Sequence, residues 1–282
     1  MNATLERMLP LYEGKMLGAY DHRAADVVKS ATAQKRQNQP RYLADEEKSD
    51  PAREAVPMSW LREELLPDLP EWLIGFSSLT SATNTRTMIA AALPKAGVGN
   101  SYPVISAVKR ECLLAVLNSF VFDYLTRIKV GGTNLNFFYV KQLPVPAPEA
   151  FSTNCPWNTS KTVGEWLAER VIALSCTSWS MTPMAKDVLR IPCVFPWDSE
   201  QRTYIRVEID AAMFIIYGIG RNEVTYVLDS FGGVAENETA TCGEYRTKRL
   251  ILQAFDAMQE AIDTGTEYHS DVERFLEEGI TR

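Results

Sequence analysis

Residues 131–146 read Gly-Gly-Thr-Asn-Leu-Asn-Phe-Phe-Tyr-Val-Lys-Gln-Leu-Pro-Val-Pro and follow a long apolar pattern. Between residues 104 and 130, apolar side chains recur at three- and four-residue spacing, which predicts an amphipathic helix. Gly131 and Gly132 supply the left-handed backbone that typically ends a helix. The stretch 135–140 is rich in β-forming residues, and Pro144 and Pro146 exclude a central strand. The pattern therefore predicts a helix, a glycine turn, a short strand and a proline exit.

Length and composition are those of a globular protein with one large or two modest domains. The 282 residues are 46% hydrophobic and 10% aromatic, so a sizeable core can be buried. No apolar stretch reaches the roughly 20 residues that span a bilayer, and no secretory signal pattern opens the sequence. A cytoplasmic protein without a membrane partner is expected. The five cysteines form no C-x-x-C pair, and with two histidines they argue against zinc and against a disulfide framework.

The charge is unevenly distributed. The net charge is −7, but residues 251–282 hold eight acids and two bases. The rest of the chain is nearly neutral, and residues 101–150 carry five bases against three acids. Local basic surfaces are therefore possible, and the net charge does not exclude a nucleic-acid partner.

The segments on either side of this region predict an α+β fold. A polar loop is expected over residues 29–57, since few apolar anchors occur there. A helix capped by Ser59 is expected over 60–66, and short strands over 72–76 and 87–93. Helical patterns follow over 202–231, with Gly218 and Gly220 interrupting them, and over 245–263 before the acidic tail.

These elements suggest three regions. Residues 1–57 form an N-terminal connecting segment with the polar loop. Residues 58–150 form a domain with a long helix and a small sheet. Residues 151–282 form a mainly helical carboxy-terminal part with an acidic tail.

Several motifs occur in a characteristic order. They are Pro10-Leu-Tyr-Glu-Gly-Lys-Met16, Tyr20-Asp-His-Arg23, Asn84-Thr-Arg-Thr87, Gly132-Thr-Asn-Leu-Asn-Phe-Phe138 with Lys141-Gln-Leu-Pro144, Trp179-Ser-Met181, Phe195-Pro-Trp-Asp198, Glu208-Ile-Asp-Ala-Ala-Met-Phe214 and Gly243-Glu-Tyr-Arg-Thr-Lys-Arg-Leu250. Over nearly its whole length the chain resembles the carboxy-terminal target-recognition region of large, fused restriction-modification DNA adenine methyltransferases. These are type IIG-like enzymes and the adenine methylases of the DISARM and BREX anti-phage systems.

The resemblance implies a DNA-reading part without its catalytic core. The relatives carry a methyltransferase core that binds S-adenosylmethionine upstream of this region, so that cofactor is expected on a separate catalytic domain or subunit and not on this chain. An amino-methyltransferase needs an Asn/Asp-Pro-Pro-aromatic loop to hold the flipped base, and the sequence has none. The Glu13-Gly-Lys15 triplet matches half of a metal-dependent nuclease motif, but the preceding acid is missing. The chain alone is therefore not expected to be catalytic.

The partner that the resemblance implies is double-stranded DNA. Thr133, Asn134 and Asn136 follow a helix end, and short amides of this kind contact base edges, with asparagine pairing to adenine. Lys129 and Lys141 flank them and can contact phosphates. Asn and Thr in a turn also bond their own backbone, which is the alternative for these residues. Phe137 and Phe138 are expected in the core.

Two further groups are candidate DNA contacts. Asn84 and Arg86 fall in a predicted surface loop, which is polar by default. Arg246, Lys248 and Arg249 lie in the first turn of a predicted helix, where the helix dipole favours anions. Either DNA phosphates or Glu244 with the acidic tail can compensate these bases. A protein-interaction or adaptor subunit of a defence complex, without direct DNA readout, remains the alternative function.

Overall fold

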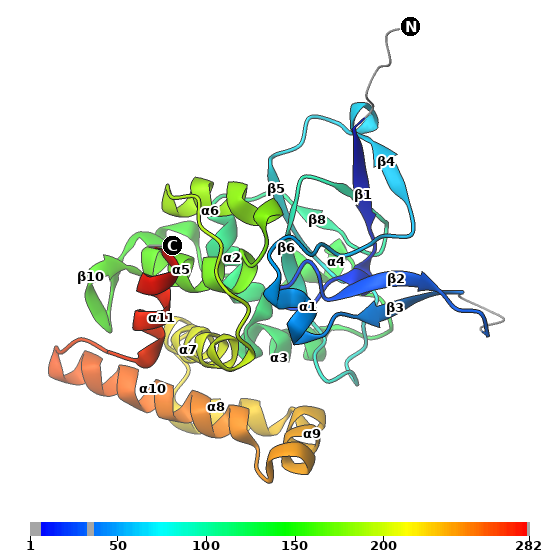
Figure 1. Ribbon diagram of the computed structural model, residues 1–282. Helices are drawn as coiled ribbons and strands as arrows, with labels where there is room; N and C mark the ends of the chain where they lie inside the picture. Colours follow the sequence, from blue (N-terminus) through cyan, green and yellow to red (C-terminus); the bar gives the residue numbers. More distant parts are fainter. Residues whose placement is uncertain (1–6, 33–36, 281–282) are drawn as a thin grey trace, which may run out of the picture.

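Most strands lie in the first 105 residues and most helices in the rest of the chain (Figure 1). The computed structural model describes residues 7–32 and 37–280. The predicted α+β class is confirmed, whereas the division at residues 57 and 150 stays a prediction. The strands are β1 (Met8–Tyr12), β2 (Ala25–Lys29), β3 (Asn38–Tyr42), β4 (Trp60–Arg62), β5 (Trp72–Phe76), β6 (Ala90–Pro94), β7 (Gly97–Val98), β8 (Val104–Ile105), β9 (Asn154–Cys155) and β10 (Asn158–Thr162).

The helices pack around one large apolar cluster that also includes residues of the strand-rich part. Helix α7 contacts α3, α5, α10 and α11, and α10 also contacts α8 and α9. The helices are α1 (Asp45–Ser49), α2 (Arg110–Asn118), α3 (Phe120–Lys129), α4 (Phe137–Val140), α5 (Val163–Ser175), α6 (Thr182–Leu189), α7 (Ser199–Ile216), α8 (Arg221–Asp229), α9 (Gly232–Cys242), α10 (Arg246–Thr264) and α11 (Asp271–Ile280).

Strand β5 is the centre of the sheet β6-β5-β8 and separates two cores. Successive side chains of a strand point to opposite faces. Ile74 and Phe76 accordingly join the large cluster, whereas Leu73 joins a smaller one with Tyr12 and Met16. Both faces are covered, which explains why a continuous apolar run forms this strand. The strands predicted over 72–76 and 87–93 are thus confirmed, the second beginning at Ala90.

The polar segment 29–57 is not a plain loop as predicted, although residues 33–36 of it lie outside the described residues. β3 pairs antiparallel with β2, and α1 follows. The buried guanidinium of Arg23 donates to the carbonyl oxygens of Lys48, Asp50 and Arg53 at 2.6 to 2.8 Å. It also donates to the Thr177 carbonyl at 2.6 Å. This side chain helps to order the segment and ties it to the carboxy-terminal part, a contact that the few apolar anchors did not predict.

The helix predicted over 60–66 is wrong. Trp60 to Arg62 form the short strand β4, which pairs antiparallel with β1, and only a 3-10 turn follows over Glu63–Leu65. Pairing with a strand some 50 residues away overrides the local helix signal.

The long helix predicted from 104 to 130 is divided in two at Ser119. This residue has extended backbone, and its hydroxyl donates to the Val116 carbonyl at 2.7 Å. The same hydroxyl oxygen accepts a hydrogen bond from the Phe122 amide at 3.3 Å. Ser119 therefore ends α2 and caps the amino terminus of α3.

The strand predicted over 135–140 is also wrong, because the segment forms the short helix α4. The side-chain oxygen of Asn136 accepts from the amides of Phe138 at 3.0 Å and Tyr139 at 3.4 Å, and so caps that helix. Gly131 and Gly132 do not adopt the predicted left-handed backbone; Val130, which is extended, ends α3 instead. Gly218 does have positive φ, at 68°, and lies just after α7, as expected. The helix predicted over 245–263 is confirmed as α10.

Candidate nucleic-acid interface

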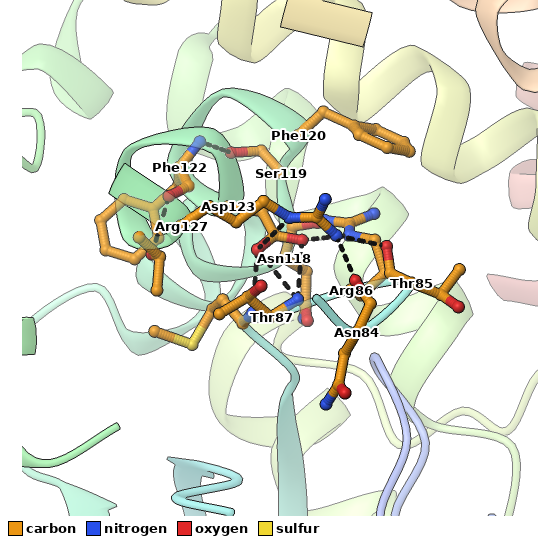
Figure 2. Close-up of polar contacts among 12 residues, drawn as sticks. Asn84, Thr85, Arg86, Thr87, Asn118, Ser119, Phe120, Phe122, Asp123 and Arg127 are labelled. Carbon is orange, nitrogen blue, oxygen red and sulfur yellow. Dashed lines mark hydrogen bonds and ion pairs between the residues drawn. The ribbon is translucent and has the colours of Figure 1, made fainter. Parts of the chain in front are cut away.

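A buried carboxylate fixes the loop between β5 and β6. Asp123 of α3 is fully buried and accepts a hydrogen bond from Arg86 Nε at 2.6 Å. It also accepts from the backbone amides of Thr87 and Met88, each at 3.0 Å (Figure 2). Three donors compensate the desolvated charge, so the loop has one preferred position against α3.

Arg127, one turn further along α3, also holds this loop. Its Nη2 donates to the carbonyl oxygens of Asn84 and Thr85, both at 2.6 Å (Figure 2). Arg86 Nη2 donates to the Asn118 carbonyl at 2.6 Å, and its guanidinium carbon lies 4.1 Å from the centre of the Phe120 ring. The loop is therefore attached to both α2 and α3.

This loop in turn holds the segment that follows α3. The Thr80 amide donates to the Thr133 carbonyl at 3.1 Å, and the Leu135 amide donates to the Ser78 carbonyl at 2.8 Å. Leu79 and Asn134 form an antiparallel bridge between the two segments. Leu135 is fully buried beside them. The backbone of residues 133–135 is thus held by residues 78–80.

The side chains of Thr133 and Asn134 remain exposed on this held backbone. Within residues 7–32 and 37–280, neither side chain has a hydrogen-bond partner. Asn136 differs, because its amide oxygen caps α4. Of the three polar residues predicted here, the first two can contact a ligand and the third serves the local structure.

Lys129 and Lys141 lie at the two ends of this segment, and both are exposed. Lys129 ends α3 and has no ion pair in the described part of the chain. Lys141 follows α4, and its Nζ lies 5.9 Å from the centre of the Phe137 ring. Both ammonium groups are therefore free to meet an anionic ligand.

The prediction that Phe137 and Phe138 are core residues is wrong. Phe137 is 40% exposed, with its ring edge-on to buried Phe76, and Phe138 is 70% exposed. Leu79 and Ile128, on the adjoining segments, are 64% and 67% exposed. We call the exposed side chains of this region the 133–134 surface; its members are Leu79, Ile128, Lys129, Thr133, Asn134, Phe138 and Lys141.

The candidate pair Asn84 and Arg86 has structural partners. Arg86 is committed to Asp123, as described above, and Asn84 Nδ2 donates to the Thr80 hydroxyl at 3.4 Å. Arg86 thus positions the loop and does not extend toward a partner. The sequence did not identify Asp123, which fixes the loop, or Leu79, which is exposed beside Asn134. No local sequence signal marks either residue.

The three basic residues at the start of α10 are neutralised by acids of this chain. Arg246 pairs with Glu200 of α7 at 3.1 Å, and Lys248 pairs with Asp229 of α8 at 2.5 Å. Arg249 pairs with Glu244 at 2.8 Å. Of the two predicted sources of compensation, Glu244 is confirmed for Arg249, and α7 and α8 supply the other two acids.

A cavity of about 200 Å³ lies between the loop and the start of α10, and of the candidate DNA contacts only Arg86 lines it. Arg86, Asp210 and Thr247 are among the residues that line it. Burial raises the pKa of the Asp210 carboxyl to about 6, although the charge of Arg86 acts in the opposite direction. Asp210 Oδ1 accepts a hydrogen bond from the Phe120 amide, at the first turn of α3, at 2.7 Å.

His22 and the Glu13–Lys15 pair play structural roles. His22 Nε2 is buried and lies 2.9 Å from the Ser178 hydroxyl, and Lys15 pairs with Glu13 at 2.9 Å. Among the described residues, no group of three or more His, Cys, Asp or Glu side chains is arranged to hold a metal ion. No described helix is both long and apolar enough to cross a membrane.

No protein-family model, curated protein or solved structure matches this chain.

Proposed function

We propose that this chain is the DNA target-recognition part of a site-specific adenine methyltransferase of a restriction-modification or phage-defence system. The catalytic core and its S-adenosylmethionine belong to another domain or subunit. The chain by itself binds double-stranded DNA without methylating it.

The observation that carries this proposal is the pair of free polar side chains on a fixed backbone. Thr133 and Asn134 are exposed and without partners in the described chain, while hydrogen bonds to residues 78 and 80 hold their main chain. A base-reading site needs side chains that are free to bond and a scaffold that fixes their position. An asparagine amide can pair with both N6 and N7 of adenine in the major groove.

The charges beside these two residues support the same proposal. Lys129 and Lys141 are free on either side, so they can bind phosphates while the shorter residues reach the bases. Because acids of the chain already pair with them, the basic groups at α10 and Arg86 are less available for this role than the two lysines. The proposed reading site is therefore limited to the 133–134 surface.

The salt dependence of binding to a mixed-sequence duplex tests this proposal. Two phosphate contacts predict that log K falls with log salt with a slope of about −2, and K129A and K141A should each reduce the slope by about 0.9. Lys29, an exposed lysine on β2, supplies the control substitution K29A, which should leave the slope unchanged. Affinity that does not depend on salt would refute the proposal.

A protein-interaction subunit without DNA readout is the second candidate. The exposed side chains of Leu79, Ile128 and Phe138 favour it, because exposed apolar groups are enriched at protein interfaces. The absence of duplex binding at low salt would favour this second function. Under the first function, the same apolar groups can contact the catalytic subunit next to the DNA.

A further inference from the structure

Two exposed tryptophans stand at a hollow in the strand-rich part of the molecule. Trp60 on β4 is 53% exposed and Trp179, just before α6, is 61% exposed. The other four tryptophans are buried or partly buried. Both exposed indoles line one hollow of about 360 Å³, together with Tyr12, Glu54 and Lys95. An exposed indole is costly in water, so two at one hollow indicate a binding surface.

A second hollow of about 800 Å³ adjoins the first. The two have Glu71, Trp179 and Pro183 in common, so Trp179 stands at the boundary between them. Together they form a groove that passes both indoles. We call it the Trp60–Trp179 groove. Its two exposed indoles and its basic side chains are Trp60, Trp179, Arg7, Lys95, Arg110, Lys186 and Arg190.

The groove is locally basic on a chain that is acidic overall. Five basic and three acidic residues line the two hollows, whereas the whole chain has a net charge of −7. Lys186 is exposed and has no ion pair within the described ranges. Arg190 has an 82% exposed side chain and lies 3.9 Å from Asp187. These cations are available to a negatively charged occupant.

The remaining bases have acidic partners. Arg7 and Lys95 share the carboxylate of Glu63, at 3.4 Å and 3.7 Å. Arg110 pairs with Asp187 at 3.2 Å and stacks over the Trp72 ring at 3.6 Å, in the wall of the second hollow. Glu54, Glu63 and Glu71 balance Arg7 and Lys95 at the Trp60 end. At the Trp179 end three bases face only Glu71 and Asp187, so the excess of positive charge lies there.

We propose that the Trp60–Trp179 groove binds a single-stranded segment of nucleic acid. The indoles stack on unpaired bases, and Arg110, Lys186 and Arg190 at the Trp179 end contact the phosphates. In a duplex the bases are stacked on one another and cannot lie on an indole, so an unpaired strand is the form that fits. The excess of positive charge favours this anionic chain over an extended peptide.

This surface is separate from the proposed reading site, with which it shares no residue. The inference therefore goes beyond target recognition of a duplex and can fail independently of it. A protein with both surfaces can hold a duplex and a neighbouring unpaired strand at the same time.

Tryptophan fluorescence of the full chain during titration with an oligothymidylate of about 12 nucleotides tests the inference directly. We expect saturable quenching whose affinity falls with salt. Three phosphate contacts predict a log–log slope of about −2, and K186A should reduce it by about 0.7. Stacking is worth about 1–3 kcal/mol per base, so W60A and W179A should each weaken binding about 5- to 150-fold.

The controls separate this inference from misfolding and from duplex recognition. Y42A removes another exposed aromatic side chain, on β3, and should leave binding of the oligonucleotide unchanged. Circular dichroism should give wild-type spectra for the tryptophan variants, since both side chains are largely exposed. N134A should leave oligothymidylate binding intact, whatever it does to duplex binding.

Three outcomes would overturn the inference. The first is the absence of saturable quenching at low salt. The second is binding of the oligonucleotide that both W60A and W179A leave unchanged. The third is binding of a proline-rich peptide that depends on Trp60 while the oligonucleotide does not bind, which would assign the groove to a protein partner.

Discussion

Arg86 Nε donates to the carboxylate of Asp123 at 2.6 Å, although the two residues lie 37 positions apart and Asp123 is fully buried. The pair joins the loop after β5 to α3. That loop in turn holds the backbone of Thr133 and Asn134. The pair thus supports the 133–134 surface through this loop, and neither residue is one of its exposed members.

Removing the Asp123 carboxylate should destabilise the protein strongly. D123A leaves Arg86 and two backbone amides without their acceptor, and breaking a buried pair costs about 3–5 kcal/mol. Urea denaturation measures the free energy of unfolding. The control is D256A, which removes the exposed partner of Arg221 and should cost less than about 1 kcal/mol. Equal losses for the two variants would contradict the structural role of Asp123.

Asn134 and Asn136 should differ in their contribution to stability. N136A removes the cap of α4 and should lower the free energy of unfolding by about 1 kcal/mol. N134A removes a side chain without partners in the described chain and should change it by less than about 0.5 kcal/mol. The reverse order would mean that Asn134 has a structural role, and would weaken its assignment to DNA.

The glycines after α3 should tolerate alanine. Gly131 and Gly132 lack positive φ, and an added methyl group would meet nothing within 4 Å. G132A should therefore stabilise the protein by up to about 1 kcal/mol, since it restricts the unfolded chain. Gly243, with φ of 78° at the end of α9, is the control, and G243A should destabilise by about 1 kcal/mol. Thermal unfolding measures both effects. Destabilisation by G132A would indicate that Gly132 has the left-handed backbone after all.

The Asp210 carboxyl should make the free energy of unfolding decrease as the pH rises. Its folded pKa is about 6, above the unfolded value, so the folded state binds the proton more tightly. Its contribution therefore favours the folded state fully below about pH 4 and is lost as the pH rises through 6.

The variant D210N isolates this contribution, because the amide oxygen can still accept the Phe120 amide. The difference in unfolding free energy, wild type minus D210N, should fall by roughly 2 kcal/mol between pH 4 and pH 7. Urea denaturation at a series of pH values gives this difference. A difference that stays constant with pH would show that the folded pKa of Asp210 is not raised.

Local patterns in the sequence predicted the elements that are buried or strongly periodic. The run 72–76 forms β5 because both of its faces are covered, and α10 follows from its apolar stripe. Two short elements were predicted wrongly. Trp60 pairs with β1, and Asn136 caps a helix in a stretch rich in β-forming residues. In each case one contact decided between two conformations of similar local preference.

The candidate site was predictable only in part. The exposure of Thr133 and Asn134 follows from short polar residues just after a helix. Arg86 is less available as a DNA contact because it pairs with Asp123. Arg246 and Lys248 likewise pair with acids of α7 and α8. Charge pairing between distant segments leaves no periodic signal, so residue type alone overestimated the number of free bases.

The central claim is that Asn134 reads a base in duplex DNA. Its most direct test is to incubate wild type, N134A and the exposed-helix control N237A with random-sequence duplexes and to sequence the bound fraction. We predict that wild type and N237A enrich the same site, and that N134A loses the preference at one adenine position, worth about 1–3 kcal/mol of discrimination. An enriched sequence that is identical for wild type and N134A would contradict the claim.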